Sequence, residues 1–118
     1  MHKYRSLEAW KRAHAAVILT LEATDGSNPP RTWNVFDQMR RAIVSVEANI
    51  VEGYALGTVP LYRRHLRIAL GSAAEGECLL NIAAERQYLS QETVARILEP
   101  LGGSMKAIVG LLRRAGTG

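Results

Sequence analysis

The sequence has little cysteine, and this excludes two classes of small protein. Cys78 is the single cysteine among 118 residues. No disulfide can therefore form within the chain, and neither a disulfide-stapled secreted fold nor a cysteine zinc cluster is available. Cys78 has no base near it in the sequence, and we expect it to pack as a small hydrophobe. A reducing cytoplasm is the compartment that fits this composition.

Long apolar runs are also missing. A bilayer span needs roughly 18 consecutive apolar residues, and no segment approaches that length. The first ten residues, MHKYRSLEAW, are charged and lack the apolar stretch of a signal peptide. We therefore expect a cytoplasmic protein with no membrane partner.

What the chain does have is the composition of a folded domain. Hydrophobic residues make up 47% and charged residues 22%, whereas a disordered chain would be poorer in the first and richer in net charge. The length suffices for one hydrophobic core but not for two. We expect a single domain over residues 1–118.

The central part of the chain has the clearest helical pattern. In residues 34–53 apolar side chains recur at spacings of three and four, so a helix would carry them on one stripe. Asn34 can cap the start of this helix, and Gly53 suits a left-handed residue at its end because it has no Cβ. The stripe consists of Phe36, Met39, Ile43, Val46 and Ile50. Such a stripe needs partner helices to cover it.

A first helix precedes the central one. Its apolar residues have the same period, Ser6 can cap its start, and it is expected to end near Thr24. Residues 25–33 follow with two prolines and a glycine, which a helix interior does not tolerate. They predict the longest loop of the chain.

The second half of the chain predicts two more helices. Thr58 can cap a third helix over residues 59–88. Ser90 can cap a fourth, in which Pro100 removes a main-chain hydrogen bond and is expected to cause a kink. No strand pattern occurs. Four amphipathic helices joined by short loops predict an all-α, up-down-up-down four-helix bundle.

The third helix is apolar on more than one side. Ile68, Leu79 and Ile82 lie off its main stripe, and leaving them in water would expose a large patch. Gly71 and Gly76 each cost about 1 kcal/mol relative to alanine inside a helix, so we expect close backbone packing at both. The extra apolar side predicts an obligate homo-oligomer.

Several segments together carry a family resemblance. Leu7 to Trp10 (LEAW), the stretch QMRRAIVSVEANIVEG at 38–53, the run at 66–77 and YLS at 88–90 resemble the four-helix-bundle proteins encoded by intervening sequences in bacterial large-subunit ribosomal RNA genes. The resemblance implies a four-helix protomer that assembles as a homopentamer. It also implies a distant similarity to the accessory variability protein of diversity-generating retroelements, a basic pentamer that engages a reverse transcriptase and nucleic acid.

Two places depart from the pattern of that family. Glu47 stands where the family usually has proline, so the central helix is expected to run straighter. Leu56 and Gly57 replace residues that are often basic, which weakens a binding argument based on charge at that point. Arg63 and Arg67 restore positive charge one or two turns later.

The resembling segments contain a set of polar and glycine residues with two interpretations. Paired carboxylates could perform acid–base catalysis, or they could pair with arginines between packed helices. We favour the structural interpretation, because an unpaired buried carboxylate is costly and two arginines lie nearby in sequence. On this view Glu77→Ala should lower the melting temperature. The set consists of Arg40, Arg41, Asn49, Glu52, Gly53, Glu75 and Glu77.

Sites for metals, cofactors and catalysis are not predicted. A di-iron bundle needs Glu-x-x-His on two helices, and no histidine lies three residues after any glutamate. His14 and His65 are more simply packed or partly exposed side chains than ligands, because a metal site needs several convergent donors. No glycine-rich phosphate loop or nucleophile elbow occurs. We therefore expect a protein that is not an enzyme and that binds no cofactor.

Positive charge is predicted to gather at one end of the bundle. Antiparallel helices place the starts of the first and third helices beside the ends of the second and fourth. By halves, that end has ten basic and three acidic residues, or +7, and the other end has −3. The predicted nucleic-acid-binding residues are Lys3, Arg5, Lys11, Arg12, Arg63, Arg64, Arg67, Arg113 and Arg114, with Lys106 in the same half.

Two functions remain open from the sequence. One is an oligomeric accessory protein that binds RNA or DNA through this basic end, with a ribosomal RNA or reverse-transcriptase context. The other is a homo-oligomeric protein–protein scaffold that binds no nucleic acid. Binding that weakens as salt rises would distinguish the first, because phosphate contacts release counterions.

Overall fold

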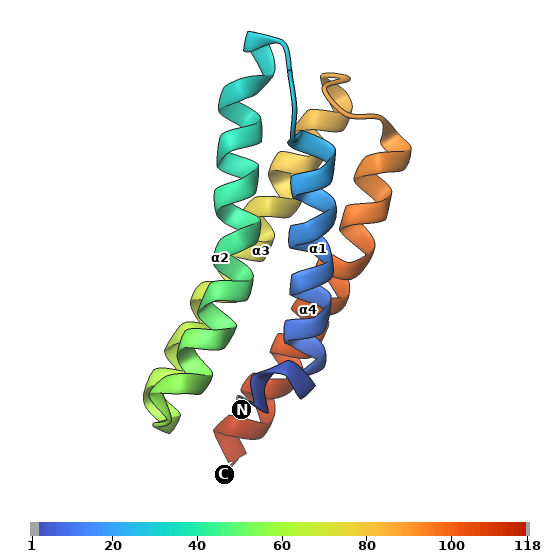
Figure 1. The fold of residues 1–118 in the computed structure, drawn as a ribbon. Coiled ribbons are helices and arrows are strands. Elements are labelled where there is room, and N and C mark those ends of the chain that lie inside the picture. The colour runs from blue at the N-terminus through green and yellow to red at the C-terminus, as the bar shows by residue number, and fades with distance from the viewer. Residues whose placement is uncertain (1–2, 118) are drawn as a thin grey trace.

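Four long helices lie antiparallel to their neighbours in sequence (Figure 1). The computed structural model describes residues 3–117, apart from the side chains of residues 115–117. The helices are α1 (Glu8–Thr24), α2 (Trp33–Leu56), α3 (Val59–Glu85) and α4 (Gln91–Thr117), with short 3-10 helices η1 (Lys3–Ser6) and η2 (Pro30–Thr32). Within residues 3–117 there is no strand. The predicted all-α, up-down-up-down four-helix bundle is confirmed.

The bundle has a simple square arrangement. α1 packs on α2 and α4, and α3 packs on the same two helices, so each helix contacts its two neighbours and not the one diagonally opposite. The whole measures 48 × 23 × 20 Å. The long axis therefore follows the helices, and side chains at one end are far from those at the other.

The predicted apolar stripe of α2 forms the middle of the core. Phe36, Met39, Ile43, Val46 and Ile50 are each at most 2% exposed. Leu66 and Leu80 of α3 and Leu101 and Ile108 of α4 are fully buried with them. Burying one such side chain stabilises the fold by about 1.5–3 kcal/mol, so these contacts dominate the packing.

Two predicted helix caps are wrong. The Ser6 Oγ donates a hydrogen bond to the Lys3 carbonyl (2.7 Å) within η1, and α1 begins after Leu7 instead. Asn34 lies inside α2, where its Oδ1 accepts a hydrogen bond from Gln38 Nε2 (3.1 Å). Both side chains find a partner one turn away, which competes with capping.

The boundaries of α2, α3 and α4 follow the predictions in part. α2 runs past Gly53 to Leu56, and the left-handed residue at its end is Gly57 (φ +77°). Thr58 precedes α3 as predicted but makes no side-chain capping bond, and α3 ends at Glu85. The main-chain N–H of Thr93 donates to Ser90 Oγ (3.1 Å), so the predicted cap of α4 is confirmed.

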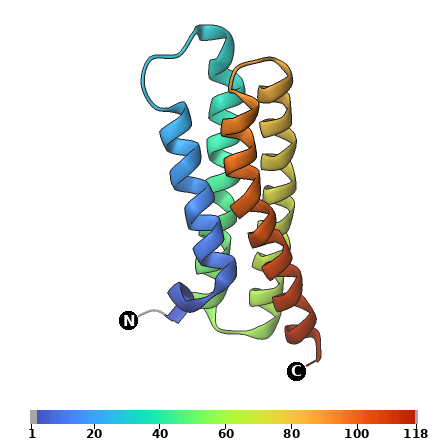
Figure 2. The same cartoon turned by 90° about the vertical axis from the view of Figure 1, so that its right-hand side faces the viewer.

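α4 remains one helix through Pro100, which is buried within it. In Figure 2 the C-terminal half of α4 leans outward from the bundle. The proline therefore does not end the helix, although it removes one hydrogen bond from it.

Close helix packing explains one of the two glycines that the sequence singled out in α3. A Cβ on Gly76 would lie 2.8 Å from Ile43 Cγ1 on α2, a separation that real side chains essentially never show. A Cβ on Gly71 would meet nothing within 4 Å, and Gly71 is exposed. The predicted close packing is correct at Gly76 and wrong at Gly71.

Candidate nucleic-acid interface

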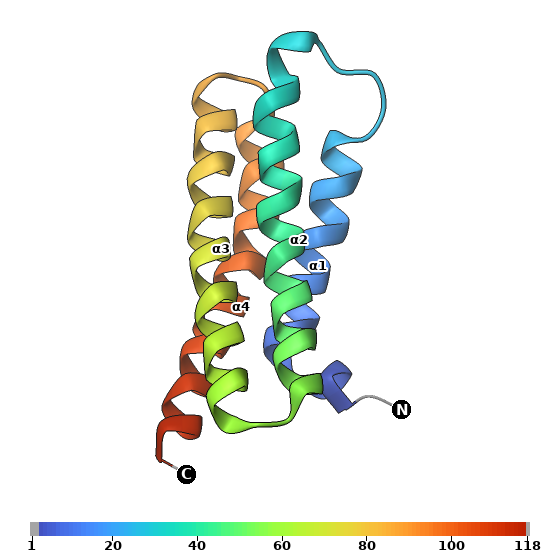
Figure 3. The same ribbon diagram turned by 90° about the vertical axis from the view of Figure 1, so that its left-hand side faces the viewer.

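The antiparallel topology brings both chain ends and the α2–α3 turn to the same end of the bundle (Figure 3). We call this end the basic pole, and it contains Lys3, Arg5, Lys11, Arg12, Arg63, Arg64, Arg67, Lys106, Arg113 and Arg114. Three acidic residues, Glu8, Glu47 and Glu52, lie in the same half, which leaves +7 against −3 at the other end. The net charge of +4 therefore understates the charge of this surface.

The arginines near the start of α3 have two different environments. Arg64 and Arg67 are exposed. Arg63 is half-buried, and its Nη1 donates a hydrogen bond to the Leu112 carbonyl (2.7 Å) on α4. A hydrogen bond donated by a charged guanidinium is stronger than a neutral one, so this contact ties α4 to α3. Arg63 therefore has a structural role that its sequence context did not indicate.

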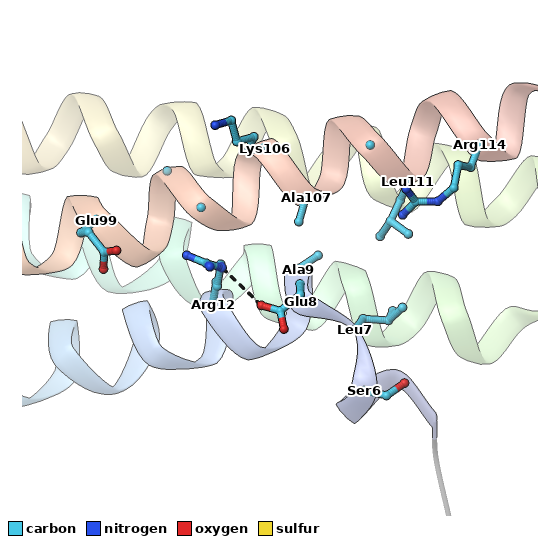
Figure 4. Close-up of a pocket in the computed structure, with 13 residues that line it drawn as sticks. Ser6, Leu7, Glu8, Ala9, Arg12, Glu99, Lys106, Ala107, Leu111 and Arg114 are labelled. Carbon is cyan, nitrogen blue, oxygen red and sulfur yellow. Dashed lines mark hydrogen bonds and ion pairs between the residues drawn. The ribbon is translucent and has the colours of Figure 1, made fainter.

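A groove between α1 and α4 adds a second part of the basic pole. It measures about 890 Å³ and has small residues such as Ala9, Ala107 and Gly110 in its lining. Arg12, Lys106 and Arg114 line the same groove, together with the acidic Glu8 and, toward the middle of the bundle, Glu99. Figure 4 shows that Arg12 comes from α1 whereas Lys106 and Arg114 come from α4. The fold thus brings together three basic residues that are far apart in sequence.

Glu8 and Gly103 hold Arg12 in this groove. Arg12 Nε lies 3.4 Å from Glu8 Oε2, and Lys11 Nζ lies 3.8 Å from Glu8 Oε1. A Cβ on Gly103 would lie 2.6 Å from Arg12 Nη1, so the guanidinium rests directly on the α4 backbone. These exposed ion pairs are weak. They fix where Arg12 lies without removing it from the surface.

Aromatic rings stack at the start of α1. Arg5 Cζ lies 6.0 Å from the centroids of both the Tyr4 and Trp10 rings. Trp10 stacks on His14 (4.9 Å between centroids), and His14 Nδ1 lies 2.9 Å from Glu47 Oε2 on α2. The half-buried Trp10 and the exposed His14 therefore form a chain of contacts that joins α1 to α2.

The predicted buried set of carboxylates is not present. Glu52, Glu75 and Glu77 are all exposed. Within residues 3–117 none of them forms an ion pair. The helical period places them on the outer faces of α2 and α3, where a single charge needs no partner. The expectation that they lie between packed helices is wrong.

The two arginines of the same set also have other partners. Arg41 Nε lies 3.0 Å from Asp37 Oδ2, one turn earlier on α2. Arg40 Nη1 donates to the Thr24 carbonyl (3.4 Å) at the end of α1. Arg40 thus closes the α1–α2 connection, and the predicted pairing with glutamates is wrong.

Asn49 and Gly53 are the members of this set that do join two helices. Asn49 Nδ2 donates to the Ser45 carbonyl (2.9 Å), so its Oδ1 is free to accept from His65 Nδ1 on α3, also at 2.9 Å. Gly53 is buried against the same histidine. His65 is therefore a packed, hydrogen-bonded side chain, as expected.

Five exposed large apolar side chains lie at two places, whereas Ile18, Trp33 and Val44 are exposed elsewhere. Leu56, Val59 and Leu61, at 46%, 55% and 37% exposure, surround the α2–α3 turn at the basic pole. Ile68 and Ile82 lie along the outside of α3 at 41% and 37% exposure. Leu79, which the sequence grouped with them, is only 7% exposed and belongs to the core of the protomer.

Among the described residues no three histidine, cysteine or acidic side chains gather in a way that could hold a metal ion. Cys78 is exposed, which corrects the expectation of a packed cysteine. Within residues 3–117 no helix is long and apolar enough to cross a membrane.

Comparison with known proteins decides the family. A model of the 23S rRNA-intervening sequence protein family matches residues 5–110, which include half of η1, all of α1, α2 and α3, and most of α4. The chain belongs to the 23S rRNA-intervening sequence protein family. The resemblance of its segments to that family is thereby confirmed. The comparison with curated proteins gives no match.

Proposed function

We propose that this 23S rRNA-intervening sequence protein is a non-enzymatic, oligomeric accessory protein of the cytoplasm that binds nucleic acid, RNA above all, through its basic pole. The observation that carries the proposal is the charge separation of +7 and −3 between the two ends. Arg64, Arg67 and Arg113 are exposed at the positive end. Arginine suits bidentate contacts with phosphate better than lysine does.

The decisive experiment compares two matched triple variants in RNA binding. Arg64, Arg67 and Arg113 are changed to glutamate at the basic pole, and Arg31, Arg86 and Arg96, which are also exposed, are changed at the opposite end. Both triples change the net charge equally. Fluorescence anisotropy with a structured RNA at low salt should show lost binding for the first triple and near wild-type binding for the second.

Salt dependence provides an independent measurement on the wild type. The logarithm of affinity should fall linearly with the logarithm of salt concentration, with a slope of about −0.7 to −0.9 per phosphate contact. The first triple should have a smaller slope and the second triple an unchanged one. Equal loss in both triples would show that only net charge matters, which would refute binding at a defined pole.

The oligomer that we propose is a homopentamer, and the number five comes from the family resemblance. Ile68 and Ile82 support self-association, because they leave an apolar side on α3 that one protomer does not cover. A cyclic assembly would place all basic poles on one face. Light scattering that finds a monomer at micromolar concentration would refute it.

A second candidate function is a protein–protein scaffold that binds no nucleic acid. The same exposed Ile68 and Ile82 favour it, since an apolar side of a helix can equally receive a partner protein. The resemblance implies a reverse transcriptase as one such partner. Binding to a partner protein that does not depend on salt concentration, and that is lost in the variant Ile68→Ser, would support this alternative.

A further inference from the structure

The α2–α3 turn at the basic pole contains an open hollow lined by two tyrosines. It measures about 240 Å³ and is lined by Gly53, Tyr54, Gly57, Thr58, Val59 and Tyr62. Tyr54 and Tyr62 are half-buried, one at the end of α2 and one in the first turn of α3. Gly57 has φ +77°, so the chain turns sharply here without a side chain to fill the space. The hollow thus follows from the turn itself.

Polar atoms at this hollow remain available to a ligand. Thr58 precedes α3 but makes no capping hydrogen bond. Within the part of the chain that is described, the hydroxyls of Thr58, Tyr54 and Tyr62 have no hydrogen-bond partner. Each hydroxyl can donate and accept. They can therefore meet the polar edge of a ligand whose flat face contacts the rings.

Positive charge lies beside the same rings. Burial raises the pKa of Tyr62 above its ordinary value of 10.0, the charge of Arg114 opposes this rise, and Tyr54 adds to it. Both Tyr54 and Arg114 therefore act on the Tyr62 hydroxyl. Arg63 and Arg64 follow Tyr62 directly on α3. Adjacent positions of a helix face different sides, so Arg114 is the cation that the structure places near the Tyr62 hydroxyl.

Apolar side chains also lie at the hollow, and they favour a ligand that has an apolar face. Val59 lines the hollow at 55% exposure, and Leu56 and Leu61 are exposed on either side of the same turn in sequence. A surface that bound phosphates alone would gain nothing from them. Unpaired bases expose flat apolar faces beside their own phosphates, whereas a duplex keeps those faces stacked inside.

We propose that the hollow between Tyr54 and Tyr62 binds a single unpaired nucleobase of an RNA whose phosphates lie on the arginines of the basic pole. The base stacks on one tyrosine ring, the hydroxyls of the other tyrosine and of Thr58 contact its edge, and Val59 covers the neighbouring nucleotide. This inference rests on the proposed function and adds to it the class of RNA. The preferred RNA has a single-stranded loop or end.

The test uses the full-length protein and two RNAs of equal phosphate count. One is a hairpin with an unpaired loop, and the other is a blunt duplex. Stacking on an aromatic side chain is worth about 1–3 kcal/mol per base. Wild type should therefore bind the hairpin at least about fivefold more tightly than the duplex.

Three variants separate stacking from charge. Tyr54→Leu and Thr58→Phe should each weaken hairpin binding by about tenfold and leave duplex binding unchanged. The first removes a ring with little loss of volume. The second fills the hollow from an exposed position, so it stays informative if the tyrosine variant folds poorly. Trp33→Leu is the control, because Trp33 is a 60% exposed aromatic at the opposite end.

A crosslink locates the base directly. A hairpin with 4-thiouridine in its loop should crosslink on irradiation to the peptide that contains Tyr54 and Tyr62, and mass spectrometry identifies that peptide.

Equal affinity for hairpin and duplex, with no effect of the variants, would overturn the inference and leave the proposed function standing. No RNA binding at low salt would refute both. Binding to anionic vesicles but not to the hairpin, with the same dependence on Tyr54, would assign the hollow to a lipid surface and overturn the inference.

Discussion

Gly53 on α2 and His65 on α3 lie so close that a Cβ at position 53 would stand 2.8 Å from the His65 Cβ. That separation sets how near the two helices approach at this level. The histidine ring also reaches Asn49, four residues earlier on α2. One glycine and one amide therefore fix both the spacing and the register of α2 against α3.

Gly53→Ala should destabilise the protein. The added methyl group must push α2 and α3 apart, and overpacking of this kind costs about 1–3 kcal/mol. The matched control is Gly71→Ala, also inside a helix, where the new Cβ meets nothing within 4 Å. It should stabilise by up to about 1 kcal/mol through helix propensity. Urea unfolding of both variants measures the difference, and similar midpoints would contradict the packing argument.

Arg63→Met should loosen the C-terminal part of α4. The variant loses the hydrogen bond from Arg63 to the Leu112 carbonyl but retains much of the side-chain volume. Hydrogen exchange should become faster in the last turns of α4. Arg64→Met, at the exposed neighbouring position, should leave those rates unchanged. Faster exchange in both variants would mean that the effect comes from charge and not from this contact.

Glu77→Ala should be close to neutral for stability. The sequence alone predicted a lower melting temperature, but Glu77 is exposed and forms no ion pair within residues 3–117. Surface changes of this kind usually fall within about 0.5 kcal/mol. A large drop in the melting temperature of the assembled protein, but not of the monomer, would show that Glu77 has a partner in a neighbouring subunit.

Ionisation of Tyr62 should lower the free energy of unfolding at high pH. Burial raises its pKa in the folded state above 10.0, the charge of Arg114 opposes the rise, and Tyr54 adds to it. As pH rises through 10.0 the unfolded chain loses the phenolic proton first, so the unfolded state is favoured. Tyr62→Phe should reduce the loss of stability above that pH. An unchanged pH profile in this variant would mean that other tyrosines or lysines cause the loss.

The helical period predicted the bundle and most of its core. Ile43 and Ile50 are buried because the apolar stripe that carries them packs against the other helices and not against water. The same period does not say which polar positions face a neighbour. Glu77 and Asn49 both lie beside apolar stripes, and only the rotation of α2 against α3 makes one exposed and the other hydrogen-bonded.

Contacts between distant segments could not be predicted from spacing. Arg63 bonds to Leu112 because the end of α4 lies beside the start of α3. Arg12 lies against Gly103 because α4 also packs on α1. The hollow at Tyr54 and Tyr62 depends on where α2 ends. The sequence predicted the left-handed residue at Gly53, and the structure has it at Gly57. Because this residue lies four positions later than predicted, Tyr54 belongs to α2 and lines the same hollow as Tyr62.

The uneven charge of the bundle also links assembly to ligand binding. Each protomer is an electric dipole along a 48 Å axis, with +7 at one end and −3 at the other. In a ring of parallel protomers the positive ends repel one another, and the repulsion is reduced by salt. A polyanion bound across them removes the same repulsion, so by thermodynamic reciprocity RNA should tighten the ring and the ring should tighten RNA. Dilution should therefore dissociate the free protein at a higher concentration than its complex, and the gap between the two should narrow as salt is added.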